Sequence, residues 1–153
     1  NPIGDTDSEF AFCCLLERLG KLWDEAKDTL PSVESRLETV AEFAAWLRPL
    51  GPFNFIYSDG DTLFVHSHLR TQDDGVIRPP GLHLLVRSCN EQAVDLTQSG
   101  VLLAPVAQEL VLVASVPLTD EPWEAIDEGE VIALRKGIVW ARASETAEEK
   151  SNE

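Results

Sequence analysis

The spacing of apolar residues changes once along this chain, close to residue 50, and that change limits the folds open to it. Before Leu47 apolar side chains recur every three or four positions, which is the period of an amphipathic helix. After Phe53 they alternate, which is the period of a strand with one buried face. Pro49, Gly51 and Pro52 separate the two regions. Helices followed by strands indicate an α+β fold, with a helix pair packed on one face of an antiparallel sheet.

Two helices are predicted in the first region. Thr6 and Glu9 have the spacing of a capping box, in which the hydroxyl of Thr6 accepts from the N–H of Glu9 and the Glu9 carboxylate reaches back to the N–H of Thr6. The apolar positions that follow are Phe12, Leu15, Leu16, Leu19, Leu22, Trp23 and Ala26. Ala11, Cys13 and Cys14 widen this apolar face, so we expect the start of the first helix to be well buried. The second helix is predicted at about Val33–Leu47.

The second region predicts a meander of five or six strands. Asp59-Gly60 is a strong hairpin signal because both residues tolerate the positive φ of a tight turn. A continuous apolar run such as LVLVASVP is typical of a strand covered on both faces. The predicted strands are Phe53–Tyr57, Thr62–His66, Gly81–Arg87, Glu109–Pro117 and a hairpin within Val131–Ala141 that turns at Lys136-Gly137, with a polar loop at Thr71–Pro80.

Length and charge exclude several classes of protein. The 153 residues suffice for one domain, which we place at residues 1–142, followed by a disordered acidic tail at 143–153. A net charge of −15 without clustered Lys or Arg argues against nucleic acid and anionic membranes as partners. No apolar run is long enough to span a membrane, and no signal peptide precedes the first helix. Three cysteines without ligand spacing favour the reducing cytoplasm.

Several side chains are candidates for chemistry, and each has a plainer interpretation. His66 and His68 share one face of a strand and could bind a metal together, but no third ligand follows at matching spacing, so we predict no metal site. His83 is alone in an apolar strand and is interpreted as a partly buried, hydrogen-bonded side chain. A thiol of Cys13 or Cys14 in mid-helix apolar surroundings is a poor nucleophile.

Two further motifs are short. Ser58-Asp59-Gly60 is interpreted first as a turn and only then as a site. Asp7 stands at the first position of the predicted helix, where the helix dipole favours a negative charge. Composition and spacing leave two roles open for Asp7, a helix-starting acid or a ligand for a cation.

Three stretches together resemble a known family. GDTDSEFAFCCLL, GPFNFIYSDGDTLFVHSHLR and VLVASVPLTDEPWEAIDEGEVIALRKG are similar to the C-terminal half of class II glutamine amidotransferase-like proteins, in the same order, over most of the chain from Ile3 to Val139. The resemblance implies an N-terminal nucleophile hydrolase fold, a four-layer αββα sandwich. It implies an amidohydrolase without a cofactor that cleaves the side-chain amide of glutamine or a γ-glutamyl compound. The nucleophile is an N-terminal cysteine upstream of GDTDSE, and Cys13 and Cys14 are helix residues in the resemblance too.

The resemblance assigns one substrate-binding residue within this sequence. The second Asp of the family's TDSE motif binds the α-ammonium of the substrate, which carries over to Asp7, with Thr6 and Glu9 supporting it. One position departs from the family, because Val116 stands where a polar residue is usual in the ASxPL strand. No catalytic residue is assigned in this chain.

The chain begins at Asn1 rather than Met, and we expect it to be a fragment or a cleavage product. It would then contain two helices and one sheet with one apolar face unpaired, inactive alone and dependent on the missing half for folding. The alternative is a catalytically dead remnant that acts as a binding or regulatory module.

Overall fold

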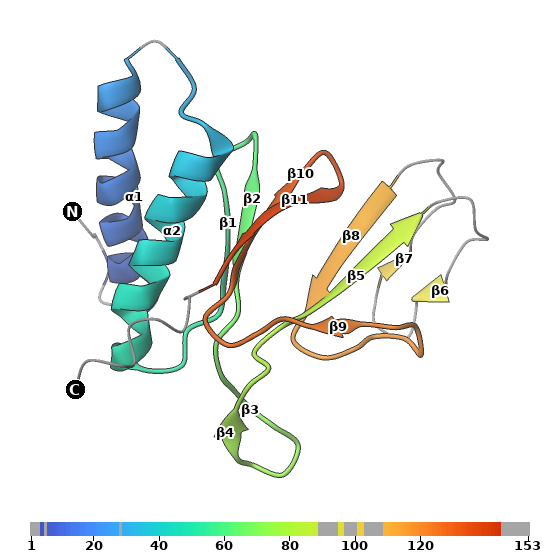
Figure 1. Cartoon of the computed structure of the whole chain (residues 1–153). Coiled ribbons are helices and arrows are strands. Elements are labelled where there is room, and N and C mark those ends of the chain that lie inside the picture. Colours follow the sequence, from blue (N-terminus) through green and yellow to red (C-terminus); the bar gives the residue numbers. More distant parts are fainter. Residues whose placement is uncertain are drawn as a thin grey trace.

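The computed structural model describes residues 4, 6–27, 29–88, 95–96, 101–102 and 109–144. Two helices come first, α1 (Asp7–Ala26) and α2 (Val33–Leu47), and a 3-10 turn η1 (Arg48–Leu50) ends the second. The strands are β1 (Phe55–Ser58), β2 (Leu63–His66), β3 (Arg70–Thr71), β4 (Ile77–Arg78), β5 (His83–Ser88), β6 (Asp95–Leu96), β7 (Val101–Leu102), β8 (Glu109–Ala114), β9 (Glu124–Ala125), β10 (Val131–Arg135) and β11 (Ile138–Ala143). The α+β prediction is confirmed (Figure 1).

Both helices begin at side-chain caps that their sequences predict or allow. The hydroxyl of Thr6 accepts from the N–H of Glu9 at 3.2 Å, as the capping box requires. Ser32 caps α2 in the same manner, accepting from the N–H of Ser35 at 3.0 Å. After α2 the chain turns through η1, which contains Pro49, and leaves the helix at Gly51 with φ of 148°.

The main sheet has the strand order β1-β2-β10-β11 and is antiparallel throughout. The two predicted hairpins form it, because β1 pairs with β2 across the Asp59-Gly60 turn and β10 pairs with β11 across Lys136-Gly137. The predicted meander is wrong in one respect. The strand beside β2 is β10, since residues between the two hairpins leave this sheet and return to it.

A second antiparallel sheet, β8-β5-β9, faces the first (Figure 1). A cluster of buried residues lies between the two sheets and joins Val65 and Ile132 of the first sheet to Leu84 of the second. This corrects the expectation of one sheet with an unpaired apolar face, because the chain supplies strands to both sheets. The two remaining sheets are the pairs β3-β4 and β6-β7.

The helix pair covers the other face of the main sheet. Its core contains Leu37, Val40, Phe43, Ala44 and Leu47 of α2, Ala11, Leu15 and Leu19 of α1, and Phe64, Val131 and Ala133 of the sheet. Helix α2 packs on β2, β10 and β11, whereas α1 packs on α2. The described residues therefore form three layers in space: the helix pair, the main sheet and the second sheet, with the main sheet in the middle.

The start of α1 is less buried than the sequence predicts. Ala11 is buried, but Phe10 and Phe12 are 55% and 49% exposed. Cys13 and Cys14 are half-buried. The widened apolar face is present, but only part of it has a partner in the described structure.

Two strand predictions differ in detail. The short hairpin β3-β4 lies at the predicted loop of Thr71–Pro80. Strand β8 is half-buried along most of its length and is not covered on both faces as predicted. Strand β11 extends to Ala143, while the rest of the predicted tail, 145–153, and Cys89 lie outside the described residues. In the part of the chain that is described, no helix is both long and apolar enough to cross a membrane.

Candidate functional site

Asp7 occupies the first position of α1 with an exposed side chain. Its Oδ1 accepts from the backbone N–H of Ser8 at 2.7 Å and lies 3.3 Å from the Ser8 hydroxyl. Among the described residues no donor bonds to Oδ2, and the side chain is exposed. A carboxylate that is fixed in direction and exposed to solvent is the kind of group that an ammonium ligand requires.

Thr6 and Glu9 hold this turn in place. Besides the Thr6 cap, the Glu9 carboxylate reaches back past the helix start, where its Oε2 accepts from the N–H of Gly4 at 2.9 Å. These bonds orient the residues on either side of Asp7 without occupying its carboxylate. The predicted trio therefore lies together on one helical turn.

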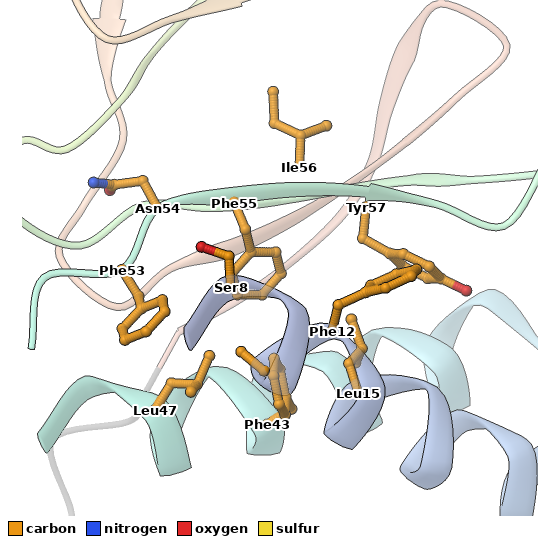
Figure 2. A pocket seen from close by; sticks show the side chains of 11 residues that line it. Ser8, Phe12, Leu15, Phe43, Leu47, Phe53, Asn54, Phe55, Ile56 and Tyr57 are labelled. Carbon is orange, nitrogen blue, oxygen red and sulfur yellow. The ribbon is translucent and has the colours of Figure 1, made fainter. Parts of the chain in front are cut away.

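A pocket of about 200 Å³ opens beside this turn, between α1, α2 and β1. Figure 2 shows Phe55 and Tyr57 of β1, and Phe53 just before that strand, pointing toward the helices, with Phe12 and Leu15 of α1 facing them. The other lining residues are Ser8, Ala11, Phe43, Leu47, Asn54 and Ile56. None of the described residues that line the pocket is charged, so this lining is suited to an apolar group rather than to a charged amino acid.

Asn54, one of the lining residues, directly precedes β1 and is hydrogen-bonded to the segment that follows β2. Its Oδ1 accepts from the N–H of His68 and its Nδ2 donates to the carbonyl of Leu69, both at 2.7 Å. Gly81 lies against this bridge, and a Cβ at Gly81 would stand 1.9 Å from Asn54 Oδ1 and 2.9 Å from the His68 nitrogen. Only glycine fits there without displacement of the bridge.

The Ser58-Asp59-Gly60 turn is bound to α2 by a buried ion pair. Arg36 is 1% exposed and donates to Asp59 Oδ2 at 2.5 Å and to Asp61 Oδ2 at 2.8 Å. Asp61 also accepts from Arg135 of β10 at 2.8 Å. Hydrogen bonds from Arg36 and then Arg135 lower the pKa of Asp61 to about 2. The turn is thus structural, as first interpreted.

The two histidines predicted to share a face do so, with ring centroids 6.2 Å apart and nearly stacked. His66 is 0% exposed, and burial is the main cause that lowers its pKa to about 4. Its Nδ1 lies 3.2 Å from the Glu130 carbonyl, which fixes the proton on Nδ1, while the buried Nε2 has no hydrogen-bond partner among the described residues. Burial likewise lowers the pKa of His68, against the opposing charge of Glu128.

Within the described ranges, no three side chains of His, Cys, Asp or Glu gather as metal ligands, around this pair or elsewhere. His83 is only partly satisfied, since the Ser115 backbone faces its ring but its buried Nδ1 has no hydrogen-bond partner among the described residues. Burial lowers the pKa of His83. Cys13 and Cys14 lie in the middle of α1 with no arrangement that would activate a thiol.

Sequence reasoning did not find the pocket or the Asn54 bridge. The alternation of Phe53, Phe55 and Tyr57 placed three aromatic rings on one face, but it did not show that this face is incompletely filled. The signal in the sequence was the presence of both Phe10 and Phe12 at the start of the first helix, because residues two positions apart lie on different sides of a helix. The structure leaves both rings about half exposed, and exposed apolar surface of this kind is typical of a binding site.

Comparison with known proteins places this chain in one family. The family model described as "Glutamine amidotransferases class-II" matches residues 1–153. An uncharacterized protein of Methanocaldococcus jannaschii is 28% identical over 89% of this chain and 36% of its own length. The Escherichia coli K12 protein YafJ, named as a candidate glutamine amidotransferase, is 31% identical over 84% of this chain and 48% of its own length.

A solved structure agrees with these matches. The crystal structure of a predicted glutamine amidotransferase from Pseudomonas aeruginosa PA01 superposes with a TM-score of 0.71 at 29% identity, covering 92% of this chain and 52% of that one. The chain thus spans about half the length of its relatives, or less. With two helices and antiparallel sheets in the order of that structure, this chain belongs to the class II glutamine amidotransferase family.

Proposed function

We propose that this chain forms the substrate-ammonium side of a class II glutaminase site. In this proposal Asp7 binds the α-ammonium of glutamine or of a γ-glutamyl compound. The observation that carries it is the Asp7 carboxylate, exposed at the first turn of α1 and held through one oxygen by Ser8. The other oxygen is the one we assign to the ligand.

The physical argument rests on charge and direction. An ammonium group requires an ionised acceptor, and charge-assisted hydrogen bonds of this type are about twice as strong as neutral ones. The positive end of the α1 dipole lies beside Asp7 and favours its negative charge. The cap made by Thr6 and Glu9 fixes the backbone that carries it. A ligand carboxylate at the same place would be repelled.

The reaction proposed is hydrolysis of the side-chain amide. A cysteine thiol from the amino-terminal part of the domain attacks the amide carbon, with the free α-amino group of that cysteine as base. The carbon–nitrogen bond breaks, ammonia leaves with the transferred proton, and a γ-glutamyl thioester remains. Water then cleaves the thioester to free glutamate and the thiol. In this scheme Asp7 holds the substrate and takes no part in bond making.

The test pairs this chain with a separately expressed amino-terminal part of a class II relative such as YafJ, chosen so that it begins with a cysteine, and measures glutamate and ammonia release. We expect Asp7→Asn to raise the KM for glutamine about tenfold or more, as loss of one charge-assisted contact does, with a smaller change in kcat. Asp24→Asn is the matched control, since Asp24 is an exposed acid of the same helix far from its first turn.

Two results would count against the proposal. Equal kinetics for Asp7→Asn and Asp24→Asn would show that Asp7 does not bind the substrate. A pair that binds glutamine through Asp7 but releases no ammonia would favour the alternative of a binding or regulatory module over that of an amidohydrolase.

A further inference from the structure

The ring of His68 lies where three segments of the chain meet. These segments are the residues just before β1, those just after β2, and the turn at 127–130 that leads into β10. The His68 residue is only 5% exposed. A buried histidine can hold a different partner on each ring nitrogen, and the partners that it prefers change when it gains a proton.

In its neutral form His68 holds the residues that lead into β1. The backbone N–H of Phe53 donates to Nδ1 of His68 in a long hydrogen bond of 3.5 Å. The backbone N–H of His68 in turn donates to Oδ1 of Asn54 at 2.7 Å. Because Nδ1 accepts a hydrogen bond, the proton of the neutral ring is on Nε2. The two residues before β1 are therefore both bonded to His68.

The other ring nitrogen of His68 faces an acid. Its Nε2 lies 3.7 Å from Oε1 of Glu128, which is too long for a hydrogen bond but close for two opposite charges. The Glu128 side chain is 53% exposed, so it has room to move closer. The turn that carries it is fixed, because the N–H of Gly129 donates to the Ser67 carbonyl at 2.8 Å. A close ion pair with His68 therefore requires movement of the Glu128 side chain only.

The groups around His68 act on its charge in opposite directions. Burial is the largest cause that lowers its pKa, and the charge of Arg48 acts in the same direction. The Glu128 carboxylate and the backbone of Gly51 favour the protonated ring and raise the pKa. The neighbouring ring of His66, 6.2 Å away between centroids, stays neutral until the pH approaches 4 because burial lowers its own pKa to about 4. The neutral form of His68 therefore predominates at pH 7.

We propose that His68 is a proton-operated latch between the start of β1 and the turn before β10. In the neutral state Nδ1 holds the N–H of Phe53. When Nδ1 takes up a proton from solvent it becomes a donor, so it can no longer accept from Phe53. The imidazolium then pairs through Nε2 with the Glu128 carboxylate, a charge-assisted contact. One hydrogen bond is exchanged for one ion pair, and no other bond forms or breaks.

Release of Phe53 changes one wall of the pocket. Figure 2 shows the ring of Phe53 pointing toward the helices, and Ser8 of α1 lines the same pocket. Without its bond to His68, the Phe53 backbone has one hydrogen bond fewer to fix this ring. The latch therefore connects mild acid to a looser wall near the first turn of α1. It goes beyond the proposed function and does not depend on the role of Asp7.

Nuclear magnetic resonance of the full, nitrogen-15-labelled chain between pH 7.5 and pH 5 tests the latch. At pH 7.5 we expect the imidazole spectrum of His68 to show the proton on Nε2. As the pH falls, the amide resonance of Phe53 is expected to shift with the same midpoint as the His68 ring. Its amide exchange, corrected for the pH dependence of an unstructured amide, is expected to rise about three- to tenfold, the usual effect of losing one hydrogen bond. The internal control is the amide of Gln72, which is bonded to the Val76 carbonyl at 2.9 Å and is expected not to respond.

Variants separate the two states of the latch. His68→Asn places an amide oxygen near the position of Nδ1 but does not titrate, so the response of Phe53 to pH is expected to vanish. His83→Asn is its control, a half-buried histidine of another strand, and is expected to keep the response. Glu128→Gln removes the anionic partner and is expected to lower the midpoint of His68 by about half a pH unit. Its control is Glu38→Gln, an exposed acid of α2, with an expected change of about 0.1 unit or less.

Several results would overturn the inference. A proton on Nδ1 of His68 at pH 7.5 would remove the acceptor that the latch requires, and a ring that stays neutral down to pH 5 would leave it without a trigger. A Phe53 amide that is unchanged while His68 titrates would show that the two are not bonded. Equal midpoints in Glu128→Gln and Glu38→Gln would exclude the ion pair, even if His68→Asn does not fold. All of these are measured on this chain alone, so none depends on whether ammonia is released.

Discussion

Acidification from pH 7.5 to pH 5 is expected to remove about 2 kcal/mol of folding free energy through His66 alone. The side chain is fully buried on β2, with the Glu130 carbonyl at Nδ1 and the ring of Phe55 5.1 Å away. Burial is the largest cause that lowers its pKa from 6.5 to about 4, and the charges of Arg48 and His68 act in the same direction. In the native state a second proton can bind only at Nε2, which is buried and has no hydrogen-bond partner among the described residues. The charge would therefore be buried and poorly solvated.

The sign follows from proton binding. Between pH 6.5 and pH 4 the unfolded chain carries a proton on this histidine that the folded chain does not, so the free energy of unfolding falls as the pH falls. The loss begins near pH 6.5 and levels off below about pH 4. The full shift is worth about 3 kcal/mol, of which about 2 kcal/mol lies above pH 5. Carboxylates contribute little there, because they titrate chiefly below that pH.

Urea unfolding followed by circular dichroism at the two pH values measures the effect. With a slope of about 2 kcal/mol per molar urea, the His66 contribution is expected to lower the midpoint by about 1 M, and His68 and His83, whose pKa values burial also lowers, add to the fall in the natural sequence. In His66→Phe, which keeps an aromatic ring beside Phe55, we expect the His66 contribution to vanish. His83→Phe is the control and is expected to retain most of it, because His83 is only half-buried. An equal midpoint shift in His66→Phe and the natural sequence would refute the reasoning.

Three further variants test separate parts of the structure by urea unfolding at pH 7.5. Arg36→Ala leaves a buried carboxylate of the β1-β2 turn unpaired and is expected to cost about 3 kcal/mol; a loss below about 1 kcal/mol would contradict the buried ion pair. Gly81→Ala drives a Cβ into the Asn54 bridge and is expected to cost about 1–3 kcal/mol, with the double variant that adds Asn54→Gly losing less than the sum. Thr6→Ala removes the α1 cap and is expected to cost about 1 kcal/mol, while Thr6→Ser is nearly neutral; equal losses would exclude the hydroxyl as the cause.

Local signals in the sequence predicted the helices and hairpins because their causes are local. Capping residues and runs of helical period define α1 and α2, Pro49 follows the end of α2, and residues with positive φ such as Gly60 and Gly137 mark the hairpin turns. Each of these depends on neighbours within a few positions. The place of Asp7 at the first turn of α1 was predictable for the same reason, whereas its role as a ligand for an ammonium group came from the family resemblance and stays a proposal.

The arrangement of the sheets was not predictable in the same way. Nothing near His66 specifies that Val131 pairs with it, and the Arg36 ion pair joins a helix to a turn more than twenty residues later. The pocket also depends on contacts between residues far apart in the sequence, because its aromatic side chains come from α1, from α2 and from β1 with the residues just before it. Alternation shows which face of a strand is apolar, but it does not show what covers that face.

The placement of β10 beside β2 also bears on the order in which the chain can fold during synthesis. Helices α1 and α2 and the β1-β2 hairpin involve contacts near in sequence, and a ribosome releases all of them early. The main sheet gains its third strand only when Val131 meets His66, after the whole intervening segment has been made. Closing so long a loop slows the pairing of β10 with β2. Until then the edge of β2 that carries Phe64 and Val65 has no β10 strand beside it. A chaperone that binds short apolar strands would find its substrate in this interval.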